Sequence, residues 1–291
     1  MTIYLSSGAF RVRSVNGVID EALRLKVKRV ELSSGLEHEP LLENTLKRGL
    51  AKGLRFLVHN YFPAPAESKV LNLTASDPEG LDWSLSHCRY ALDLTKLVSC
   101  DFYSLHSGYA VALSPQMLGK PDMQAQAFAG TKVDREAAYQ LMITSVRAVA
   151  DYASKMEKSL LLENNVISPV YLKRAPANPL LMTDAAEIVR FMKDVHRPNV
   201  GFLIDVGHTK VSATALGYDA HAFLDEVGPY IQALHLSDND GLEDQNLPFR
   251  ADSWFAPRLK DFADLPMVIE AYALEDNQIH QQLELAEKLT A

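Results

Sequence analysis

The chain has little cysteine, and its two cysteines are not spaced for a metal site or a disulfide framework. Cys88 and Cys100 form no CxxC pair among the 291 residues, so a disulfide-stabilised secreted domain is not expected. The N-terminal residues lack the basic region and the apolar region of a secretory signal peptide. We therefore predict a cytoplasmic protein.

Long apolar runs and an excess of positive charge are also missing. No run approaches the roughly 18 apolar residues of a membrane-spanning helix, so no membrane partner is expected. The net charge is −8, whereas nucleic-acid-binding proteins usually present a basic face, so no nucleic-acid partner is expected either. With 47% hydrophobic and 23% charged residues, the composition is that of a globular chain.

Short apolar segments alternate with amphipathic segments along the chain. The expected strands are residues 3–6, 27–33, 54–60, 102–107, 159–164, 200–207, 231–237 and 266–271. The expected helices include residues 18–25, 43–52, 81–97, 133–157, 183–195 and 275–289. This alternation predicts βαβ units with a parallel sheet. Eight such units predict a single (β/α)8 TIM barrel domain covering residues 1–291.

An open doubly wound sheet is the alternative fold, and it would need a glycine-rich loop after an early strand. Neither GxGxxG nor GxxxxGK[ST] occurs, which also makes a nicotinamide or flavin cofactor less expected. Two connections are long, with residues 62–80 after the third strand and residues 109–132 after the fourth. Loops of about twenty residues are uncommon in compact domains and often have a functional role.

Six consecutive expected strands end in His, Asp or Glu. These residues are His59, His106, Glu163, Asp205, His235 and Glu270. The carboxyl ends of barrel strands form the active-site mouth, and all three residue types are metal ligands. One such residue alone is more often hydrogen-bonded to a loop, but several carboxylates buried together are costly without a cation. We therefore predict a divalent metal site.

The remaining histidines and one further acid are interpreted differently. His38, His87, His196, His221 and His280 fall in expected helices or loops, where we expect packing or surface roles. Glu31 lies near the end of the second expected strand. We expect it to form an internal ion pair, with a substrate contact as the alternative.

Seven segments resemble the xylose-isomerase-like barrels, a superfamily with sugar epimerases and isomerases, inosose dehydratases and endonuclease IV type DNA-repair enzymes. The segments are VELSSG, LVHNYFP, SLHSGY, LLLENN, FLIDVGHTK, LHLSDNDG and VIEAY. The resemblance runs from the first expected strand to the last. It is more specific for the fold and the metal site than for the reaction, because members share ligands and differ in chemistry.

The resemblance implies roles for the residues at the strand ends. Glu163, Asp205, His235 and Glu270 match the four ligands of the principal metal. His208 matches a histidine that contacts substrate in the epimerases. His59 and His106 match the pair that holds another zinc in the nucleases, so they are expected either to bind a second metal or to contact substrate. The expected ion is Mn²⁺ or Zn²⁺, with Mg²⁺ or Co²⁺ as further candidates.

The segment after the seventh expected strand departs from the family pattern. The family often has Asp-x-His there, which completes a third metal site in the nucleases, whereas this chain has Asp244, Gln245 and Asn246. Asn is a weak metal ligand, so a third zinc is not expected. Residues 248–252 replace the usual Leu-Gly-x-Gly, so we expect this loop to recognise something different.

Such a donor set suits proton transfer next to a carbonyl. The cation would polarise the carbonyl of a sugar and stabilise an enediolate, while Glu163 and Glu270 would act as catalytic acid and base on opposite faces of the carbon. We predict a metal-dependent sugar isomerase or epimerase. A keto-sugar or inosose-type dehydratase is the alternative, and an endonuclease IV-like phosphodiesterase is less favoured by the charge and by Asn246.

The substrate is expected to be a small, unphosphorylated carbohydrate. The predicted substrate-binding residues are His59, His106, His208, Asn164, Asp238 and Arg250. Residues 238–244 contain four acids and no Lys or Arg. A phosphate about 6 Å from such a carboxylate would be repelled by roughly 3 kcal/mol per charge pair. Arg250 and Lys210 are the nearby cations that would offset this. The sugar and the oligomeric state are left open.

Overall fold

The structure, a computed structural model, describes residues 2–117, 133–174 and 177–291. Its centre is a closed barrel of eight parallel strands in sequence order. The strands are β1 Thr2–Ser6, β2 Arg29–Leu32, β3 Arg55–His59, β4 Phe102–His106, β5 Ser159–Glu163, β6 Val200–Asp205, β7 Ile231–Leu236 and β8 Pro266–Ile269. The predicted TIM barrel is confirmed, and every expected strand overlaps an observed one.

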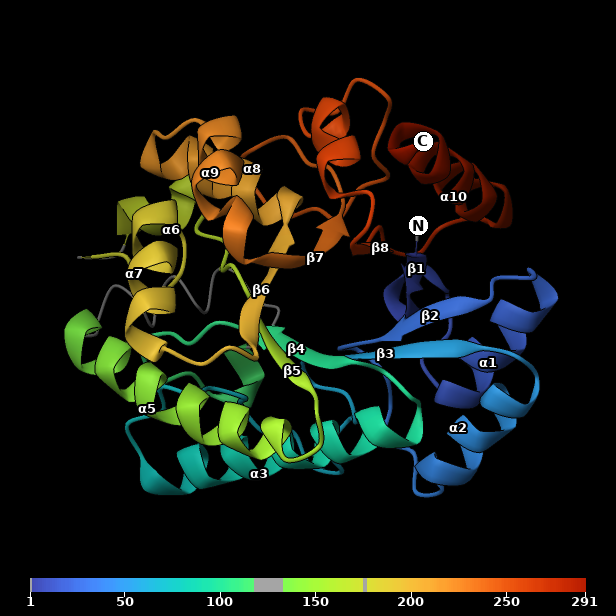
Figure 1. Cartoon of the computed structure of the whole chain (residues 1–291), viewed down its shortest axis with the longest axis horizontal. Coiled ribbons are helices and arrows are strands. Elements are labelled where there is room, and N and C mark those ends of the chain that lie inside the picture. Colours follow the sequence, from blue (N-terminus) through green and yellow to red (C-terminus); the bar gives the residue numbers. More distant parts are fainter. Residues whose placement is uncertain (1, 118–132, 175–176) are drawn as a thin grey trace.

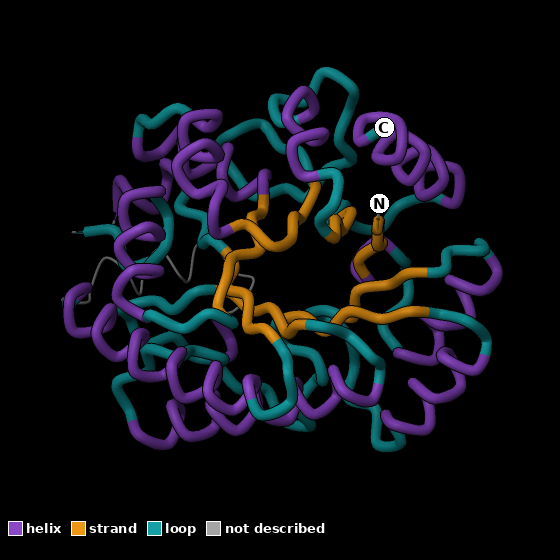
Figure 2. The backbone as a smooth tube through the Cα atoms, in the orientation of Figure 1, coloured by secondary structure: helices purple, strands orange, loops and turns teal. Residues whose placement is uncertain are grey.

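Helices surround the ring of strands (Figure 2). They are α1 Val15–Arg24, α2 Leu42–Ala51, α3 Pro78–Leu97, α5 Arg135–Ser154, α6 Pro169–Arg174, α7 Ala185–Val195, α8 Val206–Leu216, α9 Ala220–Val227 and α10 Asp276–Thr290. Short 3-10 helices cover Ser7–Ala9, Pro115–Met117, Gly228–Tyr230 and Ala256–Phe262. Helix α10 packs against β1, so both ends of the described chain meet on one side of the barrel (Figure 1).

Side chains at the helix starts explain many of these boundaries. Ser14, Asp77, Asp134, Asp184 and Asp219 each accept a backbone N–H from the first turn of the helix that follows. At α8 the same role falls to Asp205, the last residue of β6, whose Oδ1 accepts the His208 N–H at 2.7 Å. The expected strand 200–207 therefore ran two residues into α8, because Val206 and Gly207 continue its apolar run.

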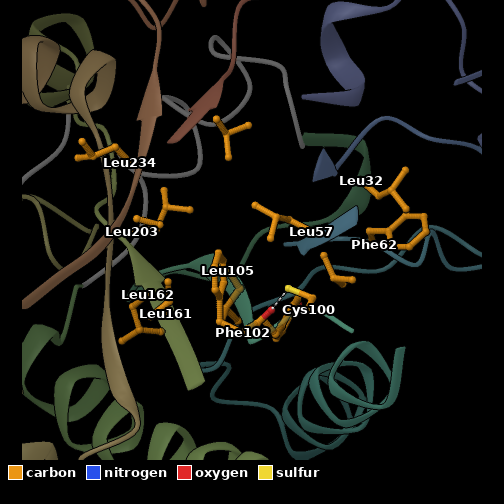
Figure 3. Packing of buried hydrophobic residues seen from close by; sticks show 14 of the residues in the cluster. Leu32, Leu57, Phe62, Cys100, Phe102, Leu105, Leu161, Leu162, Leu203 and Leu234 are labelled. Carbon is orange, nitrogen blue, oxygen red and sulfur yellow. Dashed lines mark hydrogen bonds between the residues drawn. The ribbon is translucent and has the colours of Figure 1, made fainter. Parts of the chain in front are cut away.

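Alternation along the strands places one set of side chains inside the barrel. Leu57, Leu161 and Leu203 lie two residues before polar strand ends, and all three belong to the buried apolar cluster (Figure 3). Ser104 takes the equivalent place in β4, and its hydroxyl lies 3.0 Å from His59 Nδ1. The strand ends two residues further on are thereby directed to the mouth.

The two long connections begin at the same end of the barrel as those strand ends, because they follow β3 and β4. Residues 60–77 join β3 to α3 through turns, and α3 begins at Pro78, so the expected loop 62–80 extends slightly too far. The expected loop 109–132 follows β4, and its residues 118–132 lie outside the described residues. Among the described helices, none combines the length and the apolar character needed to cross a membrane.

Candidate metal centre

Six polar side chains from the ends of β3 to β8 meet inside the mouth of the barrel. They are His59, His106, Glu163, Asp205, His235 and Glu270, of which all but His106 are buried. Glu270 follows β8 directly. The structure thus brings together the six residues that the strand ends predicted. Two overlapping groups of ligand atoms can be distinguished among them.

The first group contains the four residues predicted to hold the principal metal. Ligand atoms from Glu163, Asp205, His235 and Glu270 all lie within 4.8 Å of one another. His235 Nδ1 lies 2.8 Å from Glu270 Oε2, 3.3 Å from Glu163 Oε1 and 3.9 Å from Asp205 Oδ2. Atoms bound to one cation at about 2.0–2.2 Å are themselves some 3–4 Å apart. The spacing therefore fits a shared divalent ion.

Unpartnered buried atoms converge on the same point. In the part of the chain that the structure describes, Glu163 Oε1 and Oε2, Asp205 Oδ2 and His235 Nδ1 are buried without a hydrogen-bond partner. Buried polar atoms are normally hydrogen-bonded, and unpaired carboxylates are especially costly. A cation would satisfy all of these atoms together, so the donor set fits a divalent metal.

The second group shares Glu163 with the first. Glu163 Oε2 lies 3.3 Å from His59 Nε2 and 3.4 Å from His106 Nε2. The side chain of His106 is 38% exposed, whereas that of His59 is buried. These three residues could hold a second cation, or the two imidazoles could face a substrate that enters from the mouth.

The surroundings of the cluster shift the pKa values of its carboxyl groups in opposite directions. Burial acts to raise the pKa of Glu163, but His106, His235 and His59 hold it well below its usual value. Burial likewise acts to raise the pKa of Glu270, and His235 lowers it to about 2. Burial raises the pKa of Asp205 well above its usual value, against the attraction of His208. The buried carboxylates that interact with the histidines in this way would also attract a cation.

His208 lies in the first turn of α8 and faces the loop after β7. Its Nδ1 donates to the Asn164 carbonyl at 2.8 Å, and its Nε2 lies 3.3 Å from Asp244 Oδ2. Burial acts to lower the pKa of His208, but Asp205 and Asp244 raise it well above its usual value. The partner of His208 is therefore Asp244, an acid in residues 244–246, where the family pattern has a histidine at the third position.

Asn246, the residue at that histidine position, organises the loop instead. Its side-chain amide donates to Asp244 Oδ2 at 3.2 Å, and its carbonyl accepts the Tyr272 N–H at 3.0 Å. Its φ is +47°, a left-handed conformation that Asn adopts more readily than most residues. Asn246 thus connects the β7 loop to the residues that follow β8.

The other predicted substrate-binding residues are engaged within the protein. The Asn164 amide accepts the Asp205 N–H at 2.8 Å and donates to the Asp205 carbonyl at 3.2 Å. Asp238 accepts from Lys210 Nζ at 2.7 Å and from a serine hydroxyl. Arg250 lies at the surface and pairs with Asp252 at 3.0 Å. Their contacts with substrate stay predictions.

Three residues near the cluster were not assigned to the site from the sequence. Tyr272 donates its hydroxyl to Glu270 Oε1 at 3.0 Å, Asp244 faces His208, and Glu31 Oε2 lies 3.1 Å from His235 Nε2. Tyr272 could have been found from its place two residues after Glu270. Glu31 was expected to form an internal ion pair, and its partner in the structure is His235 on β7, three strands away around the barrel.

Gly207 keeps the turn between β6 and α8 narrow. A Cβ atom there would collide with Ser237 Oγ and would lie 3.0 Å from Asp205 Oδ1. Only glycine allows such a close approach of the backbone. Within residues 205–208, Asp205 thus ends β6 and caps α8, and Gly207 allows the close approach to Ser237.

The mouth opens into a cavity of about 1000 Å³. Its described lining includes His106, Tyr109, Asn165 and Asp244, with Arg13 and Lys69 among its cations. The histidines outside the site behave as expected. His87 is buried and stacks on Trp83 with ring centroids 5.2 Å apart, and the others are exposed. A barrel mouth with both polar and aromatic walls is suited to a small polar ligand.

Residues 19–287 match a family model described as a xylose isomerase-like TIM barrel. No curated protein is significantly similar to the chain in sequence.

Solved structures resemble the chain over its whole length. A D-tagatose 3-epimerase-like protein has a TM-score of 0.72 at 16% identity, with 100% of both chains covered. D-psicose 3-epimerase from Clostridium cellulolyticum, solved with D-tagatose, has a TM-score of 0.69 at 14% identity and covers 100% and 99% of this chain and its own. A Thermus thermophilus protein soaked with ZnCl₂ has a TM-score of 0.62 at 21% identity and 99% coverage of each. At these identities the similarity is one of fold.

Proposed function

The chain belongs to the xylose isomerase-like TIM barrel family, and from this premise we propose that it is a metal-dependent sugar isomerase or epimerase. One observation carries the proposal. Two buried carboxylates from strand ends three positions apart in the barrel, Glu163 and Glu270, converge on His235 Nδ1 together with atoms that lack partners in the described chain. Structural neighbours named as sugar epimerases support this class of reaction.

We infer that Glu163, Asp205, His235 and Glu270 hold the cation. Three oxygen donors and one nitrogen suit Mn²⁺ or Zn²⁺. When bound, the cation supplies Lewis-acid polarisation of the substrate carbonyl and charge stabilisation as a proton leaves the neighbouring carbon.

The protein's own side chains would move the proton. Glu163 and Glu270 approach the shared point from β5 and from the end of β8, so each can act on a different face of a substrate carbon held between them. One removes a proton and the other returns one. Tyr272 holds Glu270 Oε1 with its hydroxyl, which leaves the other oxygen directed toward His235 and the cluster.

Binding of the substrate's hydroxyl groups falls to the mouth. Asp244, His106 and Asn165 line the cavity, and His208 holds Asp244 through its Nε2 at 3.3 Å. Sugar hydroxyls both donate and accept hydrogen bonds, so such mixed groups suit them. We propose that the four residues position the sugar chain relative to Glu163 and Glu270.

The charges near the β7 loop favour an unphosphorylated sugar. Lys210 is paired with Asp238, and Arg250 with Asp252, so each of these two cations is already engaged by an acid of the protein and is not free to bind a phosphate. Arg13 and Lys69 line the outer cavity and are the groups that would bind a distal anion if the substrate carried one.

Metal analysis of matched variants tests the metal-dependent part of this function. Wild type loaded with Mn²⁺ or Zn²⁺ and then desalted is expected to retain the ion, whereas Glu163→Gln loses it because it removes a shared ligand. Glu187→Gln is the control, since Glu187 is a half-buried acid that pairs with Arg135 on the outer helices. Equal metal content in wild type and Glu163→Gln, or none in either, would contradict the proposal.

A further inference from the structure

Glu31 lies entirely inside the barrel, beneath the candidate metal ligands. It is 0% exposed on β2, and its Oε2 lies 3.1 Å from His235 Nε2. Its other oxygen, Oε1, has no hydrogen-bond partner within the described part of the chain. The nearest basic residue in sequence, Arg29, is exposed at the start of the same strand. Glu31 is therefore tied to the ligand cluster through His235.

Packing does not explain a carboxylate in this place. A buried acid with a single hydrogen-bonded partner is costly, and an apolar residue of similar size would often be neutral or stabilising there. Leu32 and Val30 beside it on β2 are buried apolar residues. The retained charge points to a role in the site.

The contact determines which nitrogen of His235 is available. A carboxylate accepts hydrogen bonds, so His235 Nε2 must donate its proton to Glu31. In a neutral imidazole the other nitrogen then carries a lone pair. That nitrogen, Nδ1, is the atom that lies 2.8 Å from Glu270 Oε2 and 3.3 Å from Glu163 Oε1. The hydrogen bond thus directs the lone pair into the group of prospective ligands.

His59 shows a weaker form of the same arrangement. Its Nδ1 lies 3.0 Å from the Ser104 hydroxyl, and its Nε2 faces Glu163 Oε2 at 3.3 Å. A hydroxyl can donate or accept, so it does not fix the proton position as a carboxylate does. The carboxylate of Glu31 therefore contacts His235, the histidine that belongs to the four-residue group of prospective ligands.

We propose that Glu31 is a positioning residue that holds His235 as the Nε2–H tautomer, with Nδ1 facing the cation, and thereby sets the affinity of the centre for its metal. The inference rests on the proposed metal centre and extends it to a residue outside the group of Glu163, Asp205, His235 and Glu270. Metal-bound histidines commonly donate their second N–H to such an acceptor, and loss of the acceptor typically weakens metal binding 10–100-fold.

Two substitutions separate the hydrogen bond from the charge. Glu31→Gln removes the charge but keeps an oxygen that accepts from Nε2, so its Kd for Mn²⁺ or Zn²⁺ is expected to rise only about threefold. Glu31→Met has a similar size and no acceptor, so its Kd is expected to rise about 10–100-fold with the number of bound ions unchanged. Kd is measured by competition with a chelator of known affinity. Glu187→Gln serves as the control for loss of an acid away from the cluster.

A spectrum of the wild type tests the tautomer directly. In the Zn²⁺-loaded protein labelled with ¹⁵N-histidine, two-bond ¹H–¹⁵N correlations are expected to show His235 protonated at Nε2. The Glu31→Gln variant, which shifts that signal, assigns it. Protonation at Nδ1 would overturn the inference.

The affinity data can overturn it in three further ways. Equal binding by wild type and Glu31→Met would show that the contact does not matter. Equal weakening by Gln and Met would show that charge alone acts. Loss of one ion per chain would make Glu31 itself a ligand. Absence of metal from the wild type would instead contradict the proposed centre, and this inference would fall with it.

Discussion

His208 Nε2 lies 3.3 Å from Asp244 Oδ2, across the gap between the first turn of α8 and the loop after β7. The opposite nitrogen of the ring is committed, because the Asn164 carbonyl can only accept its N–H. The Asn246 side-chain amide donates to the same Asp244 oxygen at 3.2 Å. Both ring nitrogens of His208 therefore face acceptors of the protein, which fixes the pair at the mouth of the barrel.

Replacement of His208 is expected to weaken substrate handling and leave the metal in place. His208→Asn removes a hydrogen bond between charged groups, which is worth about 1.5–3 kcal/mol, so kcat/KM should fall roughly 10–150-fold. Asp244→Asn should act in the same direction. Steady-state kinetics and metal analysis on the same samples give the answer. A loss of one ion per chain in His208→Asn would contradict this role and favour a multi-metal, nuclease-like site.

The Tyr272 hydroxyl is expected to matter for turnover more than for metal binding. Tyr272→Phe removes the hydrogen bond to Glu270 Oε1 and keeps the ring that packs beside Gly8. Since hydrogen bonds to charged groups contribute about 1.5–3 kcal/mol, kcat should fall at least about tenfold, while metal Kd changes little. An unchanged kcat in the variant would show that Glu270 needs no such support.

The fold and the main ligand cluster could be predicted from the sequence because both depend on local periodicity. Eight apolar runs that alternate with amphipathic segments define the barrel, and parallel strands in a barrel bring their carboxyl ends to one mouth. Residues such as Glu163 and His235 were therefore predictable as neighbours although they lie 72 positions apart in numbering. Helix α8 was missed because its start continues an apolar strand.

Contacts across the barrel and within irregular loops were not predictable in the same way. The partner of Glu31 depends on side-chain reach across the closed ring from β2 to β7, which no sequence spacing encodes. The partner of Asp244 was not predictable either, because it lies on another element of the barrel. Its contact with His208 joins the loop after β7 to α8 and is a tertiary contact.

His87 is expected to make stability depend on pH. Burial lowers the pKa of His87, and its hydrogen bond to the Asn60 carbonyl opposes this. The unfolded chain then takes up a proton below about pH 6.5 while the folded chain does not. Stability is fully present above that pH and falls as the pH drops toward the folded-state pKa, by at most about 1.4 kcal/mol per pH unit.

His87→Gln keeps a donor for Asn60 and removes the titrating ring. Urea unfolding of both proteins between about pH 7.5 and 5.5 should show a smaller loss of unfolding free energy for the variant. Parallel curves for wild type and variant would contradict this contribution of His87.

Substrate charge can be tested with matched pairs of a free ketose and its terminal phosphate. Because Lys210 and Arg250 are paired with acids, the free sugar is expected to have the higher kcat/KM. A value about tenfold higher for the phosphate, a difference of some 1.4 kcal/mol, would show that Arg13 and Lys69 form an anion site. Arg13→Gln and Lys69→Gln should abolish that preference if it exists.

The most direct test of the proposed reaction is proton exchange at carbon. Metal-loaded protein is incubated in heavy water with a panel of free ketoses and keto-acids, and the products are examined by mass spectrometry and NMR. We predict that one substrate gains deuterium at the carbon next to its carbonyl without loss of water, and that Glu270→Gln and chelator-treated protein give none. Loss of water from the substrate would identify a dehydratase, and absence of exchange across the panel would contradict an enzyme that transfers protons on sugars.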